Sequence, residues 1–199
     1  MGKTFIIAEA GDNHNGDIRL AYQLIDAAVE AGADCVKFQT FITDEIVSQQ
    51  AEMAEYQKKN IGVTESQYDM VKKLELSFTD FRNLKDYCDK KGIMFLSTPF
   101  DLQSIDFLDT LNLKFWKIPS GEITNLPYLI KIAQTKKEVI LSTGMATMDE
   151  IEAAVNVLQK NGTKKINILH CTTEYPAPLE EVNLRAINTI ADYFHVDVG

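Results

Sequence analysis

The sequence lacks long hydrophobic runs. No apolar stretch in its 199 residues approaches the roughly 18 to 20 residues that a membrane-spanning helix needs. The first residues, Met1 to Thr4, lead directly into a short apolar segment, with no hydrophobic region of signal-peptide length and no small-residue cleavage site. We therefore expect no membrane partner.

Cysteine is also scarce. The three cysteines, Cys35, Cys88 and Cys171, are an odd number at wide spacings and form no C-x-x-C pair. This pattern disfavours both a disulfide framework and a cysteine-type zinc site, and it is typical of a reducing cytoplasm. Cytoplasmic localisation is the corresponding prediction.

Basic residues are outnumbered by acidic ones. The chain has 20 Lys and Arg against 29 Asp and Glu, which gives a formal net charge of −9. Such a balance disfavours nucleic-acid partners and anionic membranes, but it leaves room for a local cationic pocket that binds a small anion. Hydrophobic residues make up 45% of the chain, which indicates a globular protein.

Short apolar runs alternate with amphipathic segments along the whole chain. Segments with helical spacing lie around residues 21–28, 81–88, 151–158 and 184–190, and Asn125 and Pro127 mark the start of another helix. The apolar runs that we interpret as buried strands are residues 5–8, 35–38, 94–96, 115–118, 139–141, 166–169 and 196–198.

This alternation predicts an α/β fold with a parallel sheet, either a doubly wound open sheet or a (β/α)8 TIM barrel. Almost every run ends in polar residues that could take part in chemistry. Function at the ends of many strands favours the barrel, because an open sheet concentrates it at one switch point. We find six βα units and the start of strand seven within one domain over residues 1–199. A full barrel needs eight units, so we expect an incomplete barrel.

The interval from Ile42 to Ser77 is too long for an ordinary connection. It is polar, with weak helical patterns around residues 46–56 and 66–74. The interval is either a surface insertion or a loop that partly covers the mouth of the barrel.

Two lysines fall within apolar runs. Lys37 either forms a structural ion pair with Glu9 on the neighbouring strand or serves as an anion-binding or Schiff-base lysine. Lys117 closes another run. We expect both lysines to converge on one anion, because strand ends also carry hydroxyl groups that phosphate and carboxylate favour, at Thr98, Ser120 and Ser142. Each of these hydroxyls could instead belong only to a turn.

Three further segments have two readings each. The loop at residues 13–17 is either a turn in which Asp17 caps a helix or a source of sugar contacts from Asn13 and Asn15. His14 and His170 are each either a structural histidine or a ligand, although the histidines have no metal-ligand spacing. The Pro-rich loop at 175–178 either holds Tyr175 over the barrel mouth or is simply a turn.

Six of these segments together resemble the sialic acid synthase (NeuB) family. The motifs occur in the family's order and span essentially the whole chain. They are IIAEAGDNHNGD at 6–17, AGADCVKFQTF at 31–41, FLSTPFD at 95–101, KIPSGEITN at 117–125, ILSTGMAT at 140–147 and LHCTTEYPAP at 169–178.

The resemblance implies a TIM barrel that condenses phosphoenolpyruvate with an N-acylated amino-sugar aldehyde, giving a nonulosonic acid and phosphate. It also implies assistance by a divalent metal, manganese or magnesium. It gives a catalytic role to Glu9 and Glu122 near the reacting carbons. Its further assignments are Lys37, Lys117, Thr98, Ser120 and Ser142 to phosphoenolpyruvate, and Tyr175, Gln39 and Asn13 to the substrate-binding mouth.

The chain departs from the family pattern in three respects. Residue 173 is Thr where some members carry Asn. The two metal-binding histidines of the family belong to strands seven and eight, beyond Gly199, so no metal ligand is assigned within the chain. The C-terminal antifreeze-like domain, which full-length members place across a homodimer partner, is also absent. We therefore expect the 199-residue chain alone to be inactive.

Two alternatives to the synthase remain open. One is a Schiff-base aldolase that uses Lys37 or Lys117 with free pyruvate. The other is a non-catalytic piece, or half of a split protein. The motifs do not choose among N-acetylmannosamine, its 6-phosphate, and the precursors of legionaminic or pseudaminic acid.

Overall fold

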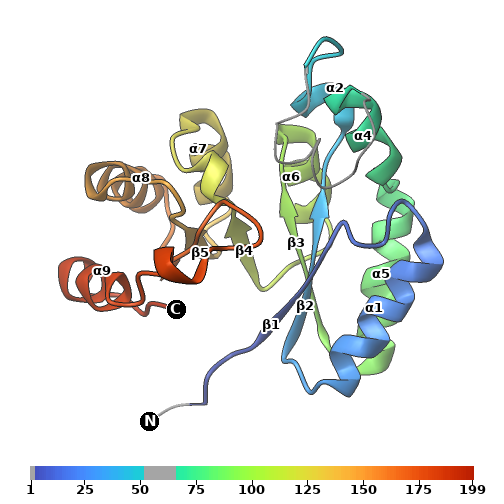
Figure 1. The fold of residues 1–199 in the computed structure, drawn as a ribbon, viewed down its shortest axis with the longest axis horizontal. Helices are drawn as coiled ribbons and strands as arrows, with labels where there is room; N and C mark the ends of the chain where they lie inside the picture. Colours follow the sequence, from blue (N-terminus) through green and yellow to red (C-terminus); the bar gives the residue numbers. More distant parts are fainter. Residues whose placement is uncertain (1–2, 52–65) are drawn as a thin grey trace. The chain divides into compact units, whose positions relative to one another are not determined.

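The computed structural model describes residues 3–51 and 66–199 and shows an α/β fold with parallel sheets (Figure 1). The chain divides into two compact units, Met1–Leu111 and Asn112–Gly199. Within the described residues, no helix has both the length and the apolar character that crossing a membrane requires.

The first unit contains a three-stranded parallel sheet in the order β1-β2-β3. Helices α1 and α5 run side by side along it (Figure 1). Its elements are β1 (Ile7–Gly11), α1 (Ile18–Glu30), β2 (Cys35–Thr40), α2 (Thr43–Ile46), α4 (Gln67–Leu74), α5 (Phe78–Lys91), β3 (Met94–Pro99) and α6 (Leu102–Asp109).

Strand β2 shows how this unit builds a polar face on an apolar core. Phe38 is fully buried and stacks on Phe95 of β3, with ring centroids 6.0 Å apart. Neighbouring side chains on a strand point to opposite faces, so Lys37 and Gln39 share the face opposite Phe38. The hydrophobic side anchors the strand, and the other side presents the polar groups.

The second unit contains a parallel sheet in the order β4-β5-β6, and helices α7 and α8 pack side by side (Figure 1). Its elements are β4 (Phe115–Ile118), the 3-10 turn η1 (Ser120–Glu122), α7 (Leu126–Gln134), β5 (Glu138–Ser142), α8 (Met148–Lys160), β6 (Ile166–Leu169), η2 (Leu179–Glu181) and α9 (Ala186–Phe194).

Several predicted helix starts are confirmed. Asn125 caps α7 by accepting a hydrogen bond from the backbone N–H of Tyr128, and Pro127 lies in the first turn. Thr147 and Glu150 form a capping box at α8, in which each side chain accepts from the other residue's backbone N–H. The strand ends that precede these helices are thereby held in place.

Some element boundaries were predicted wrongly. The first strand begins at Ile7 rather than Phe5. Phe5 and Ile6 are about half exposed, so they do not belong to the buried strand that their apolar character predicted. Val198 forms an isolated parallel bridge to Ile168 and not a full strand. Leu184 precedes α9 and is exposed, whereas its spacing had placed it on the helix.

Helices in the interval from Ile42 to Ser77 were predicted in part. The stretch around 66–74 is confirmed as α4. Helix α2 ends at Ile46, where the other predicted stretch begins, and residues 52–65 of that interval lie outside the described residues. The prediction of one incomplete barrel domain stays a prediction.

Candidate functional site

In the first unit, Lys37 lies at the centre of a polar cluster. Only 8% of the residue is exposed. Its ammonium forms an ion pair with Glu9, and Nζ donates a hydrogen bond to Thr98 Oγ1 at 3.4 Å. The parallel register explains these contacts, because it sets Glu9 opposite Lys37 on adjacent strands. Of the two readings of Lys37, the structure shows the ion pair with Glu9, and a role for Lys37 in anion binding or as a Schiff base stays a prediction.

Gly11 allows the same cluster to include Gln39. It lies where the β1–β2 register shifts and has φ +54°, a conformation that glycine adopts without strain. A Cβ at this position would meet Glu9 Oε1 at 3.2 Å and Gln39 Nε2 at 3.5 Å. The Glu9 carboxylate and the Gln39 amide therefore both lie close to the space that a side chain at position 11 would occupy.

In the second unit, Lys117 and Ser142 form a buried polar pair across β4 and β5. Lys117 is 6% exposed and Ser142 is 5% exposed. Lys117 Nζ donates to Ser142 Oγ at 2.5 Å and to the carbonyl oxygen of Ile118 at 3.1 Å. A buried ammonium requires such acceptors, because leaving it unpaired would cost several kcal/mol.

Ser120 lies next to the loop that follows β5. Its Oγ accepts a hydrogen bond from the Gly144 backbone N–H at 2.9 Å. A Cβ at Gly144 would meet Thr173 Cγ2 at 2.7 Å, Ser120 Oγ at 3.0 Å and the Cys171 carbonyl oxygen at 3.2 Å. Glycine at 144 thus lets three chain segments approach closely at the strand ends.

Three other predicted residues have local surroundings of their own. The half-buried Glu122 accepts a hydrogen bond from Asn125 Nδ2 at 2.6 Å, so it also supports the cap of α7. Tyr175 is 70% exposed. Asn13 is exposed, and its backbone N–H donates to the Ala10 carbonyl oxygen within the turn.

His14 is buried, with 1% of its surface exposed. Its Nδ1 accepts from the Gly16 backbone N–H at 3.1 Å, and Nε2 has no hydrogen-bond partner among the described residues. Burial lowers the pKa of His14, although the nearby Asp12 carboxylate opposes this shift. Asp17 caps α1, as the turn interpretation predicted.

The side chains that could ligate a metal are dispersed in the part of the chain that the structure describes. Over residues 3–51 and 66–199, no three His, Cys, Asp or Glu side chains gather closely enough to hold a metal ion. In the second unit, the Lys117 ammonium and the Ser120 and Ser142 hydroxyls suit an anion better than a cation. In the first unit, the Lys37 ammonium is already paired with the Glu9 carboxylate.

The candidate residues divide between the two units. Glu9, Lys37, Gln39 and Thr98 form the cluster of the first unit, and Lys117, Ser120 and Ser142 form the cluster of the second. The convergence of the two lysines on one anion stays a prediction.

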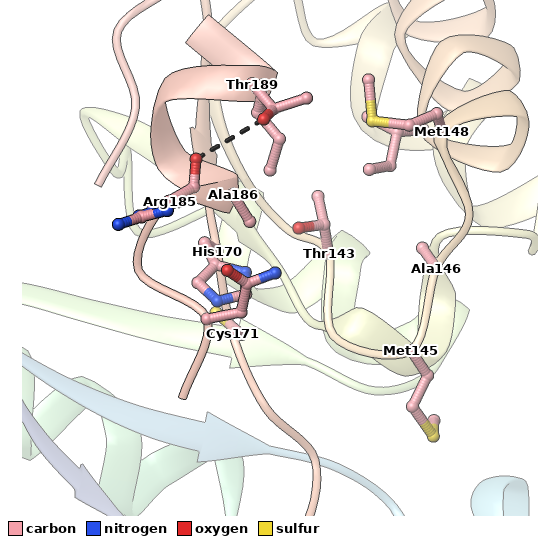
Figure 2. Close-up of a pocket in the computed structure, with 12 residues that line it drawn as sticks. Thr143, Met145, Ala146, Met148, His170, Cys171, Arg185, Ala186 and Thr189 are labelled. Carbon is pink, nitrogen blue, oxygen red and sulfur yellow. Dashed lines mark hydrogen bonds between the residues drawn. The ribbon is translucent and has the colours of Figure 1, made fainter. Parts of the chain in front are cut away.

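The second unit also has an open pocket of about 390 Å³ that sequence reasoning missed (Figure 2). Its lining includes Thr143, His170, Cys171 and Arg185, and the ten predicted site residues are not among the twelve described residues that line it. Cys171 also contacts the second-unit cluster, because its Sγ donates a hydrogen bond to Ser142 Oγ at 3.3 Å. Its position two residues after β6 is the sequence signal that could have identified Cys171.

The chain belongs to the NeuB family, whose model matches residues 24–199. It is 58% identical to the N,N'-diacetyllegionaminic acid synthase of Campylobacter jejuni over 100% of the chain and 60% of that protein. It is 50% identical to the synthase of the same name from Legionella pneumophila, over 98% of the chain and 56% of that protein.

Among solved structures, the chain is similar to the N-acetylneuraminic acid synthetase of Leptospira borgpetersenii. The TM-score is 0.85 at 34% identity, over 100% of the chain and 64% of that structure. The chain thus spans somewhat more than half the length of the curated relatives named above.

Proposed function

We propose that the protein condenses phosphoenolpyruvate with an N-acylated amino-sugar aldehyde, giving a nonulosonic acid and phosphate. Family membership supports this reaction class. The observation that carries the proposal is the buried pair of Lys117 and Ser142, with Ser120 close to the same strand ends. Positive and neutral donors together are what the phosphate and carboxylate of phosphoenolpyruvate require.

In this proposal, the second-unit cluster binds the anion directly. The Lys117 ammonium supplies the charge, and the hydroxyls of Ser142 and Ser120 supply directed hydrogen bonds. Lys117 is already buried and held by hydrogen bonds. Anion binding therefore costs little further desolvation or ordering of this side chain. The resemblance gives Lys37 and Thr98 the same kind of ligand.

The chemistry requires a base as well as an anion site. The C3 carbon of phosphoenolpyruvate bonds to the aldehyde carbon, whose oxygen takes a proton. Water then adds at C2 and loses a proton, and the C2–O bond to phosphate breaks to leave the ketone. Glu9 and Glu122 are the candidate bases. Gln39, Asn13 and Tyr175 are proposed to contact the sugar.

Three parts of the proposal rest on the resemblance and the relatives. They are a (β/α)8 barrel for the βα units, a homodimer for the whole protein, and a requirement for manganese or magnesium. The described side chains do not fit a metal by themselves, so no step above is routed through one.

The names of two relatives support a narrower substrate. Both are N,N'-diacetyllegionaminic acid synthases, at 58% and 50% identity. A nine-carbon product that carries two acetyl groups, minus the three carbons of phosphoenolpyruvate, leaves a six-carbon aldehyde with two acetamido groups. We propose this aldehyde in preference to N-acetylmannosamine.

The test uses the whole protein, completed to the length of its relatives. It measures phosphate release from phosphoenolpyruvate with a panel of amino-sugar aldehydes in the presence of manganese. We expect release only with an aldehyde present, and fastest with the diacetamido sugar. Release that does not depend on any aldehyde would contradict the condensation. The Schiff-base alternative predicts instead that borohydride and pyruvate trap a covalent adduct on Lys37 or Lys117.

A further inference from the structure

Ser142 sits between two donors. Lys117 Nζ donates to its Oγ at 2.5 Å, and Cys171 Sγ donates to the same oxygen at 3.3 Å. The three residues come from β4, from the end of β5 and from the position two residues after β6, so the parallel sheet itself brings them together.

The two contacts determine which way the Ser142 hydroxyl points. A hydroxyl oxygen has two lone pairs and one hydrogen, and an ammonium group can only donate. With one lone pair facing Lys117 and the other facing Cys171, the hydrogen of Ser142 must point away from both. Ser142 is then a donor before any ligand arrives.

We propose that Cys171 is a positioning residue, which acts by holding the Ser142 hydroxyl in the donor orientation that a bound anion needs. This inference rests on the proposed function, because it assumes that phosphoenolpyruvate binds at Lys117 and Ser142. The thiol itself does not touch the ligand. Its contribution is orientation of a group that does.

The contact is sensitive to the chemistry of residue 171. A thiol is a weak donor, so its removal costs less than removal of Lys117. In Cys171→Ala, one lone pair of Ser142 becomes free and the hydroxyl can rotate away from the donor orientation. We expect the Kd for phosphoenolpyruvate to rise about three- to tenfold, the range for one net hydrogen bond. Cys171→Ser keeps a donor and should recover most of the affinity.

A double-mutant cycle tests this assignment directly. Calorimetry would measure phosphoenolpyruvate binding to the wild type, Cys171→Ala, Ser142→Ala and the double variant, with Met145→Ala as a control at an exposed position of the neighbouring loop. If Cys171 acts through Ser142, the alanine at 171 has no further effect once Ser142 is gone. An equal loss in both backgrounds, or none in Cys171→Ala, overturns the inference.

The same cycle, with Lys117→Met measured beside it, separates this inference from the proposed function. If Ser142→Ala weakens binding and Cys171→Ala does not, only the role of Cys171 falls. If neither Ser142→Ala nor Lys117→Met changes binding, the proposed anion site falls and the inference falls with it.

Alkylation of the wild type supplies a test that needs no variant. Cys171 is partly exposed, whereas Cys35 and Cys88 are buried, and burial raises the pKa of both thiols to about 12. Iodoacetamide should therefore react first at Cys171, where the thiolate displaces iodide and the sulfur loses its hydrogen. Mass spectrometry would locate the adduct. Singly alkylated protein with unchanged phosphoenolpyruvate affinity would overturn the inference.

Discussion

Substitution of Lys117 by Met would test the anion site, because we predict a large loss of phosphoenolpyruvate affinity with little change in the stability of the fold. Methionine has a similar length and fills the same buried space without the charge. Lys117 is almost fully buried, and its Nζ donates hydrogen bonds to Ser142 Oγ and to the Ile118 carbonyl oxygen. Its loss removes both the charge and the partner that holds Ser142.

Truncation of one partner in a buried, hydrogen-bonded charge contact costs about 2 to 5 kcal/mol of binding free energy. At 1.4 kcal/mol for each factor of ten, the Kd for phosphoenolpyruvate should rise from about 30-fold to several thousand-fold. The thermal midpoint should change little, because replacement of a buried charge by an apolar side chain of similar size is often close to neutral for folding.

The assay is calorimetric titration of phosphoenolpyruvate, with thermal unfolding of the same samples. Lys114→Met is the matched control, since it makes the same change of residue and net charge at an exposed position just before β4. An unchanged Kd in Lys117→Met, or an equal loss in Lys114→Met, would refute the assignment of Lys117.

Three further predictions concern other residues. Glu122→Gln keeps an oxygen that can accept from Asn125 and removes the charge, so turnover should fall roughly 100-fold while phosphoenolpyruvate binding survives; near-normal turnover would transfer the base role to Glu9. Gly144→Ala would place a Cβ 2.7 Å from the Thr173 methyl group, so we expect the fold to lose about 1 to 3 kcal/mol of stability. Thermal unfolding would measure this loss, and wild-type stability in the variant would contradict the close approach. Burial lowers the pKa of His14, so the folded state binds fewer protons than the unfolded chain below pH 6.5; stability should be fully present above that pH and fall as the pH drops below it, by up to about 1.4 kcal/mol per unit. His14→Asn, which keeps an acceptor for the Gly16 N–H, should flatten that dependence in denaturant titrations across pH, and an unaltered slope would count against it.

Local signals predicted the fold best where each had a defined physical cause. The cap at Asn125 and the capping box of Thr147 and Glu150 were predicted because their side chains satisfy N–H groups only a few residues away. Helix α6 was not predicted. It has eight residues, and its start depends on Asp101, whose carboxylate also accepts from the Ile42 backbone N–H, 59 residues away in sequence.

The site residues, like the fold, were predictable where a local pattern had a physical cause and not where a contact joins residues distant in sequence. Lysine in an apolar run indicated a buried charge that needs a partner, and both Lys37 and Lys117 have one. The ion pair to Glu9 was predictable because the two residues share a register on neighbouring strands. The role of Cys171 was not, because its contact to Ser142 depends on how two strand ends, 29 residues apart in sequence, approach each other.

The most direct measurement is a crystal structure of the protein grown with phosphoenolpyruvate. The account predicts that the anion accepts hydrogen bonds from Lys117 Nζ and from the hydroxyls of Ser142 and Ser120, with Cys171 Sγ still donating to Ser142. Phosphoenolpyruvate bound elsewhere, with neither Lys117 nor Ser142 in contact with it, would contradict the account.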